Sequence, residues 1–260
     1  MQACILCPFV TWLISFFYRE KQMKRLNISP DLTVYQFTQP VNDANMYVML
    51  QEDEGLIIDT FRTEELKRLL DENGIRKLTI LLTHEHWDHT GGVPWLQSLY
   101  ECSVYAGENA AENLKNEEQN MSRHYRALLL LRKGTDRAAV DAMDIRPVSI
   151  VPDVLLKDRE RLVWKDHNLT IRFTPGHTEG SISILADDCC IFTGDSLVNG
   201  HPTITRFYSG SPVRLEQITR PILESFPDGL MVCPGHGEVD RLERLRPFLG
   251  SDGRLTNGGI

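Results

Sequence analysis

The sequence predicts a mixed α/β fold in which two packed β-sheets carry helices on their outer faces. Two observations support this prediction. Short β-branched or apolar runs, bounded by turn residues, recur in both halves of the 260-residue chain. Each half also contains segments with helix signals, and no low-complexity linker separates the halves. We therefore expect one domain over residues 23–260, preceded by an apolar extension over residues 1–22.

The individual elements follow from local signals. Thr63 is a typical N-cap, with Glu64 and Glu65 in the first helical turn after it and Gly74 beyond the helix end. The continuous apolar run at 78–82 predicts a strand. The strands expected are 34–37, 46–50, 56–58, 78–82, 148–156, 161–164, 169–174, 181–186, 190–193 and 230–232, and the helices are 63–70, 108–133, 212–226 and 240–248.

Amino-acid composition limits the molecules that the protein is expected to bind and the compartment in which it is expected to act. The chain has 28 Lys and Arg against 36 Asp and Glu, a net charge of −8. This acidic balance argues against a broad nucleic-acid surface, so we expect a small-molecule substrate and no nucleic acid. The six cysteines are too scattered for a small-domain disulfide framework, which favours a reduced, cytoplasmic setting.

The N-terminal extension is apolar but short. Its apolar run covers residues 5–18, fewer than a confident membrane span requires. It lacks a preceding positive region and a clear cleavage site for a secretory signal. Arg19, Lys21, Lys24 and Arg25 follow it and would favour weak association with a membrane surface. We interpret residues 1–22 as a dispensable extension, such as an upstream start-site artefact, and expect no stable membrane insertion.

The motif that carries chemistry follows the strand at 78–82. His84, His86, Asp88 and His89 fall within six consecutive positions, as His-x-His-x-Asp-His. Packing explains this cluster poorly, because each buried member would need its own polar partner. Residues two apart in extended backbone point the same way, so His84 and His86 can share one metal ion. Once the loop turns, Asp88 and His89 can face a second ion.

Three more strands end in the same way. In each, an apolar run is followed by glycine and then by a residue that commonly binds metals. Loops at strand ends on a rigid scaffold are where such ligands are normally mounted. The three residues delivered in this way are His177, Asp195 and His236. Five of the eight histidines thus belong to one proposed constellation.

These motifs resemble those of the metallo-β-lactamase superfamily, over roughly residues 31–248. The matching segments are His-x-His-x-Asp-His at 84–89, Thr-Pro-Gly-His-Thr-x-Gly-Ser at 174–181, Gly-Asp at 194–195 and Pro-Gly-His at 234–236. The resemblance implies an α/β fold of four layers, an αββα sandwich of two mixed sheets with helices outside. This fold agrees with the order of strands and helices given above.

The resemblance also implies a ligand set. It assigns three residues to each of two ions and one residue to both. Asp59 resembles the aspartate that supports the ligands in this family, although Phe61 stands where a glycine is usual. The first ion would be bound by His84, His86 and His177, the second by Asp88, His89 and His236, and Asp195 would bridge them.

Five imidazoles and two carboxylates suit two divalent metal ions, with zinc as the expected metal and iron or manganese as alternatives. A hydroxide shared by the two ions would be the nucleophile near neutral pH, and Asp88 can shuttle a proton. We expect hydrolysis of a thioester, lactone or other ester. The alternatives are a phosphodiesterase acting on a small phosphate ester and a mononuclear iron persulfide dioxygenase.

Departures from known branches of the family refine this expectation. A glyoxalase II proper carries a helical domain after its last ligand, whereas 24 residues follow His236 here, so that substrate module is expected to be missing. The best-known antibiotic-hydrolysing members lack a bridging aspartate. The complete ligand set argues against a non-catalytic metal-binding domain.

Two further segments are predicted to form the substrate pocket. A helical insert at about 107–146, containing Met121, Tyr125 and Leu128, is interpreted as covering the metals; an ordinary outer helix is the alternative. Tyr208 lies after Asp195 in the sequence and is predicted to donate a hydrogen bond to a developing oxyanion, with simple packing as the alternative.

Overall fold

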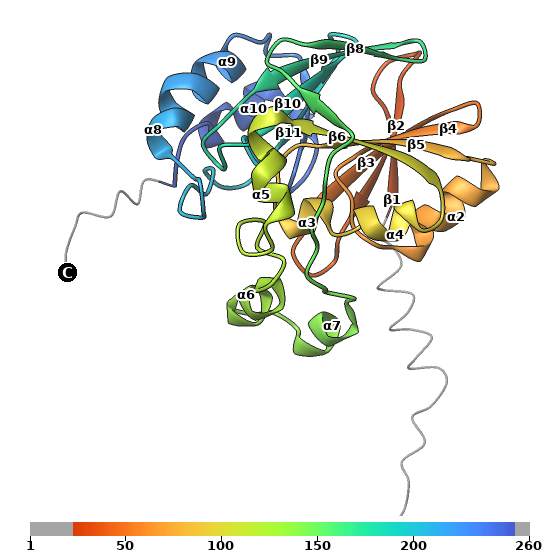
Figure 1. The fold of residues 1–260 in the computed structure, drawn as a ribbon. Coiled ribbons are helices and arrows are strands. Elements are labelled where there is room, and N and C mark those ends of the chain that lie inside the picture. Colours follow the sequence, from red (N-terminus) through yellow and green to blue (C-terminus); the bar gives the residue numbers. More distant parts are fainter. Residues whose placement is uncertain (1–22, 253–260) are drawn as a thin grey trace, which may run out of the picture.

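A computed structural model describes residues 23–252, in which thirteen strands form two mixed sheets (Figure 1). The first sheet has the order β1-β2-β3-β4-β5-β6-β7, antiparallel from β1 to β4 and parallel from β4 to β7. Its strands are β1 (Met23–Asn27), β2 (Thr33–Thr38), β3 (Asn45–Gln51), β4 (Glu54–Ile58), β5 (Lys77–Leu82), β6 (Glu101–Gly107) and β7 (Val154–Leu156).

The second sheet has the order β13-β12-β11-β10-β9-β8. Its strands pair antiparallel except for β11 and β12, which are parallel. This parallel pair places the carboxyl ends of two neighbouring strands at the same sheet edge. The strands are β8 (Arg161–Trp164), β9 (His167–Phe173), β10 (Ile182–Ala186), β11 (Cys190–Gly194), β12 (Met231–Pro234) and β13 (Asp240–Arg241).

Short helices cover both outer faces. In the first half they are α2 (Glu64–Glu72), α3 (Trp87–Thr90), α4 (Val93–Gln97), the 3-10 turn η1 (Glu108–Ala110), α5 (Ala111–Lys115), α6 (Tyr125–Leu131) and α7 (Arg137–Ala142). In the second half they are α8 (Pro212–Arg214), the π-turn η2 (Leu215–Thr219), α9 (Arg220–Glu224), α10 (Leu242–Leu245) and the 3-10 turn η3 (Arg246–Phe248). In Figure 1, α6 and α7 lie together on one side of the molecule, beyond α3 and α5.

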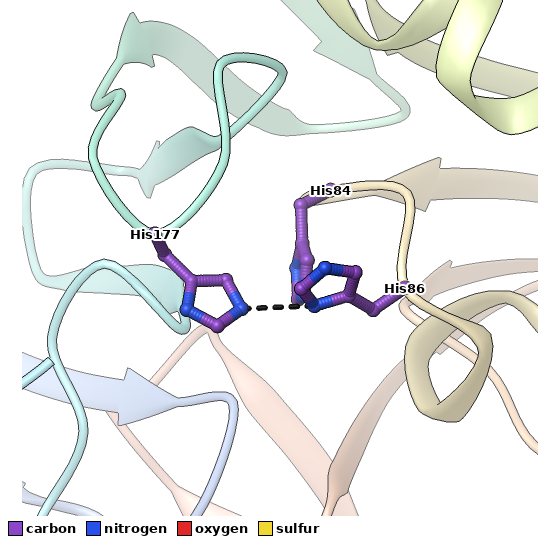
Figure 2. Close-up of side chains that lie close together, drawn as sticks. All are labelled: His84, His86 and His177. Atoms are coloured by element: carbon purple, nitrogen blue, oxygen red, sulfur yellow. Dashed lines mark hydrogen bonds between the residues drawn. The ribbon is translucent and has the colours of Figure 1, made fainter. Parts of the chain in front are cut away.

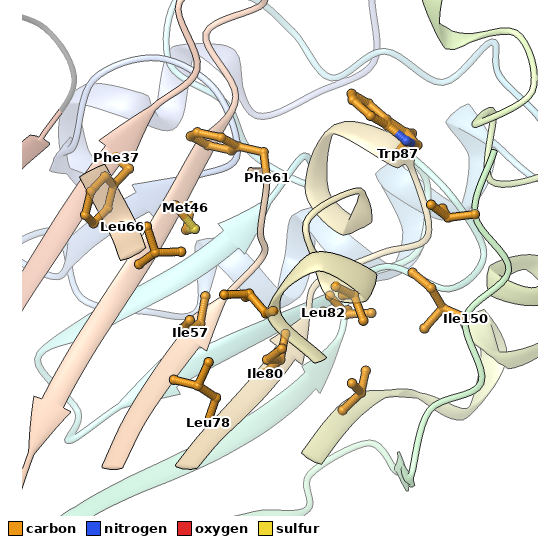
Figure 3. Packing of buried hydrophobic residues seen from close by; sticks show 14 of the residues in the cluster. Phe37, Met46, Ile57, Phe61, Leu66, Leu78, Ile80, Leu82, Trp87 and Ile150 are labelled. Atoms are coloured by element: carbon orange, nitrogen blue, oxygen red, sulfur yellow. The ribbon is translucent and has the colours of Figure 1, made fainter. Parts of the chain in front are cut away.

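Three apolar clusters separate these layers. Successive side chains of β3 point to opposite faces of the first sheet, so this strand contributes to two of the clusters. Met46 and Val48 face the helices, whereas Tyr47 and Met49 face the second sheet. The outer cluster includes Phe37, Leu66 and Trp87 (Figure 3). The third cluster lies between the second sheet and α9 and α10. The layers therefore run helix, sheet, sheet, helix, and the predicted αββα sandwich is confirmed.

The structure differs from the sequence prediction at several elements. Strand β6 was not predicted, although it pairs in parallel with β5 along its whole length. The segment expected to be helical at 108–133 divides into α5 and α6. Asn120 explains the break, because its buried amide donates to the backbone carbonyls of Leu114 and Val148. Met121 then adopts a left-handed backbone with φ of 65°.

Two expectations concern the N-terminal extension and membrane insertion. The predicted extension at 1–22 lies outside the described residues. Within residues 23–252, no helix combines the length and the apolar character needed to cross a bilayer.

Candidate metal centre

Two groups of side chains that can bind metal ions meet where strands of both sheets end. His84 and His86 follow β5, and His177 lies in the loop between β9 and β10 (Figure 2). Their potential ligand atoms lie within 4.8 Å of one another, and the same holds for Asp88, His89 and His236. The structure thus brings together six residues that the sequence predicted, in the two predicted groups.

The first group consists of three buried histidines. Nε2 of His177 lies 2.9 Å from Nδ1 of His86. The ring of His84 lies edge-on to both others, at centroid distances of 4.8 and 4.9 Å. Burial lowers the pKa of all three, to about 3 for His86. They are therefore neutral imidazoles at neutral pH, which is the form that binds metals.

The second group mixes charge. Nε2 of His89 lies 3.3 Å from Nε2 of His236, and Asp88 Oδ2 lies 3.5 Å from the same atom of His236. Burial acts against charge here, but Asp195, Asp88 and Asp59 raise the pKa of His89 to about 9. Burial is likewise outweighed at Asp88, whose pKa His89 and His236 lower. Without a bound cation, His89 is therefore protonated at neutral pH and lies beside the Asp88 carboxylate.

Asp195 joins the two groups. Its Oδ1 lies 3.4 Å from Nε2 of His89. Its Oδ2 lies 3.4 Å from Nε2 of His177 and 3.4 Å from Nε2 of His236. It therefore contacts members of both groups, as a bridging ligand must. Burial would raise the pKa of Asp195, but His236, His89 and His177 hold it well below its usual value.

The other ring nitrogen of each of three histidines is engaged by an acceptor. Nδ1 of His177 donates to the carbonyl oxygen of Ile204 at 2.7 Å, and Nδ1 of His236 donates to that of Asn42 at 3.0 Å. Nδ1 of His89 donates to Asp59 Oδ2 at 2.8 Å. In the neutral form that binds a metal ion, each of these rings keeps its one N–H at Nδ1, so the Nε2 lone pair would point into the centre.

Asp59 also orients the His84 ring, indirectly, through a hydrogen bond with Thr83. The Thr83 hydroxyl donates to Asp59 Oδ2 at 2.7 Å, so it can only accept from Nδ1 of His84, which lies 3.1 Å away. The Thr83 amide also donates to Asp59 Oδ1 at 2.7 Å. Asp59 adopts a left-handed backbone with φ of 57°. The sequence prediction that Asp59 supports the ligands agrees with these contacts.

These residues fit divalent ions on a structural observation. His84 Nε2, His86 Nε2 and Asp195 Oδ1 are buried side-chain atoms that have no hydrogen-bond partner within the described chain. Unpartnered polar atoms are costly in a protein interior. In addition, the Nε2 atoms of His89 and His236 lie 3.3 Å apart. A bound cation would satisfy all of these atoms together.

Glu85 is a buried residue of the site that the sequence did not single out. Its carboxylate accepts from Asn113 Nδ2 and Thr178 Oγ1, each at 2.8 Å, and from Ser209 Oγ at 3.3 Å. Burial raises its pKa. Glu85 thus ties α5 and two loops to the segment that carries the ligands. A single sequence gives no signal that separates it from a surface glutamate.

Asn42 and Tyr125 form a second set of contacts that the motifs did not reveal. Asn42 Nδ2 donates to Asp88 Oδ2 at 2.9 Å and to the Tyr125 hydroxyl. The Tyr125 ring packs against the Trp87 ring at an interplanar angle of 33°, with centroids 4.7 Å apart. Burial, together with the neighbouring Asp88 carboxylate, raises the pKa of Tyr125, so the phenol keeps its proton at neutral pH.

A cavity of about 800 Å³ opens over these residues. Its floor includes five of the seven predicted ligands. Met121, Tyr125 and Leu128 of the predicted insert line one side of it. Tyr208 is not among the described residues that line this cavity; it is 53% exposed, and its hydroxyl accepts from Gln119 Nε2. The ligands on the floor are His86, Asp88, His177, Asp195 and His236.

The αββα sandwich and the paired donor groups define a class of metal-dependent protein. Residues 40–236 match the family model of the metallo-beta-lactamase superfamily, and the chain belongs to that superfamily.

Three relatives illustrate this membership. The chain is 28% identical over 211 residues to the probable metallo-hydrolase YqgX of Bacillus subtilis (strain 168), and this match covers 79% of this chain and 92% of that protein. It is 26% identical over 221 residues to the hydroxyacylglutathione hydrolase of Cronobacter sakazakii (strain ATCC BAA-894), with 84% and 72% covered. The crystal structure of BLEG-1 B3 metallo-beta-lactamase has a TM-score of 0.65 at 26% identity, with 83% and 99% covered.

Proposed function

We propose that this protein is a cytoplasmic dinuclear metal-dependent hydrolase that cleaves a thioester, lactone or other ester. One observation carries the proposal: the Nε2 atoms of four histidines and the Asp195 carboxylate converge from both sheets, and each histidine is oriented by a partner on its far nitrogen. His84, His86 and His177 would hold one ion, Asp88, His89 and His236 the other, and Asp195 both, with zinc as the proposed metal.

Two bound divalent ions would supply a water of lowered pKa and a Lewis acid for a carbonyl oxygen. The protein's own groups do the rest. Asn42 Nδ2 holds Asp88 Oδ2 at 2.9 Å, which orients this carboxylate to take up a proton at the floor of the cavity. The protonated Tyr125 hydroxyl lies beside it and can donate to an oxygen that gains negative charge.

An ester substrate is supported by sequence similarity to a named hydrolase and by the charge of the site. The hydroxyacylglutathione hydrolase is, by its name, a thioester-cleaving relative. An acidic chain with a carboxylate at each metal group favours an uncharged carbonyl over a phosphodiester anion. The described cysteines Cys102, Cys189, Cys190 and Cys233 are free thiols, which supports a reducing compartment.

One experiment tests the proposal against its alternatives. Protein reconstituted with zinc, iron or manganese, at measured metal content, is assayed on a thioester, a lactone, a phosphodiester and a persulfide, the last with oxygen uptake recorded. We expect turnover of at least one carbonyl ester that scales with the occupancy of two ions. Turnover confined to the phosphodiester, or oxygen uptake with one equivalent of iron, would replace the proposal.

A further inference from the structure

The cavity above the metal centre has two apolar walls. We call the first the α6 wall; it consists of Met121, Tyr125, Leu128, Leu129 and Leu131. The second, the 198–207 wall, consists of Val198, Ile204 and Phe207. Both walls line the same cavity as the metal-binding residues of the floor, so a substrate bound at the floor would have hydrocarbon side chains beside it.

The 198–207 wall begins at the metal centre itself. The Phe207 ring meets the ring of His86 edge-on, at a centroid distance of 5.7 Å, and that of His177 at 6.4 Å. An acyl group whose carbonyl lies at the floor would therefore meet an aromatic surface at its first carbons.

The α6 wall continues the apolar surface outward. Leu128 is partly buried, whereas Leu131 is 81% exposed, the most exposed large apolar side chain in the described part of the chain. An exposed leucine side chain beside a cavity is unfavourably hydrated, and a bound apolar group that covered it would recover this free energy. Leu131 thus marks where the far end of a bound hydrocarbon chain would lie.

The α6 wall is also held in place before any substrate binds. The Tyr125 ring packs against Trp87, and its hydroxyl accepts from Asn42. Met121 keeps a left-handed backbone, stabilised because the preceding Asn120 amide binds two distant carbonyl oxygens. A preformed wall does not lose conformational entropy when a ligand binds, so its apolar contacts contribute to affinity.

Charged groups that line the cavity are paired only in part. Lys24 pairs with Glu238 at 2.5 Å, and Arg206 pairs with Asp252 at 3.0 Å while its guanidinium covers the Phe207 ring. Asp43 and Arg132 also line the cavity and have no ion pair within the described chain. The lining thus combines two apolar walls with both paired and unpaired charged groups.

From these contacts we infer that the substrate carries an apolar acyl chain of several carbons, bound between the α6 wall and the 198–207 wall. The inference rests on the proposed function and specifies its substrate class. It separates this protein from its hydroxyacylglutathione-cleaving relative, whose name specifies a polar hydroxyacyl group.

The test is a series of thioesters with one common thiol and acetyl, butanoyl, hexanoyl or octanoyl groups, plus a lactoyl thioester. For the metal-loaded enzyme, kcat/KM should rise by about fourfold for each methylene that the walls bury. The lactoyl thioester should be a poorer substrate than the butanoyl one. Leu128→Ala and Leu131→Gln should each lower the octanoyl-to-acetyl ratio by about fourfold or more.

Leu99→Gln is the matched control, because Leu99 is also an exposed leucine but lies outside the cavity. It should keep the wild-type ratio. A ratio that falls equally in the control, or a flat profile across the series, would overturn the inference while leaving an ester hydrolase in place.

A binding measurement separates this inference from the proposed function. Octanoate and acetate are titrated calorimetrically into metal-loaded wild type and Leu131→Gln. We expect octanoate to bind more tightly than acetate in the wild type, with the difference reduced in the variant. If no thioester, lactone or other ester is hydrolysed, the proposed function fails, and these affinities still decide the inference: equal affinities overturn it, and a chain-length difference that Leu131→Gln reduces supports it.

Discussion

Asp59 Oδ2 accepts a hydrogen bond of 2.8 Å from Nδ1 of His89, and the same oxygen accepts from the Thr83 hydroxyl that contacts His84. One carboxylate thereby orients a histidine from each of the two proposed metal groups. Affinity for both ions should therefore depend on a residue that contacts neither.

Asp59→Asn should lower the affinity for both ions by roughly 10- to 100-fold. The carboxylate accepts at both oxygens, from the Thr83 amide at Oδ1 and from the Thr83 hydroxyl and His89 at Oδ2, whereas an amide has only one accepting oxygen. Competition with a chromophoric chelator measures the two dissociation constants. Asp53→Asn is the control, since Asp53 is exposed on the surface. Unchanged affinities in Asp59→Asn would contradict this role.

Asp195→Ala should lose metal and activity together. Its carboxylate lies 3.4 Å from three histidine nitrogens that belong to both groups, so its removal weakens both sites. Elemental analysis of the purified variant, alongside the thioester assay, gives both quantities. A variant with two equivalents of metal and full turnover would refute the bridging assignment.

Gly235→Ala should disturb the same carboxylate from the backbone side. A Cβ at position 235 would lie 2.1 Å from Asp195 Oδ1 and 2.7 Å from the carbonyl carbon of Gly194, so Asp195 must move. We expect metal affinity to fall at least tenfold, in line with other losses of ligand support. Gly229→Ala, whose nearest neighbour would be Arg241 Nη1 at 3.5 Å, should bind metal normally. Equal affinities in both variants would count against this steric argument.

Tyr125→Phe should lower kcat about 10- to 100-fold, the range for losing a hydrogen bond to a charged group, while metal content stays unchanged. The phenylalanine ring preserves the packing against Trp87, so α6 should remain in place. Tyr208→Phe tests the sequence prediction in the same assay: a kcat reduced at full metal content would support it. If kcat is unchanged in Tyr125→Phe, the hydroxyl has no catalytic role.

The stability of the metal-free protein should depend on pH through His86 and His89. Burial lowers the pKa of His86 to about 3, against 6.5 when unfolded. Between these values only the unfolded chain binds the proton, so the unfolding free energy falls as the pH drops, by up to ~1.4 kcal/mol per pH unit.

His89 acts with the opposite sign. Although burial opposes it, the surrounding carboxylates raise its pKa to about 9, so its contribution is complete below pH 6.5 and lost as the pH rises through 9. Urea unfolding of the metal-free protein at about pH 5, 7 and 10 should therefore give the largest free energy near neutrality. A free energy that increases toward either extreme would show that other groups dominate.

The proposed ligand residues could be selected from the sequence because each follows an apolar strand and a turn, so local sequence defines both the strand and its end. The supporting contacts were not. Asn42 reaches Asp88 and His236 only through long-range packing, and Glu85 is buried only because α5 covers it. Strand β6 escaped prediction because only three of its seven positions are buried, so its sequence has no continuous apolar run. The break in the helical segment depends on distant carbonyl groups that bind Asn120.

The position of the proposed centre between the sheets also constrains how the protein acquires its ions. Four of the proposed ligands follow β5 in the first sheet, and the other three belong to loops of the second, with His89 and His236 separated by 147 positions along the chain. Neither half alone can hold both ions. Metal loading must therefore come late in folding, after the sheets have docked, and a nascent chain released from the ribosome would bind its ions only once its last strands are in place.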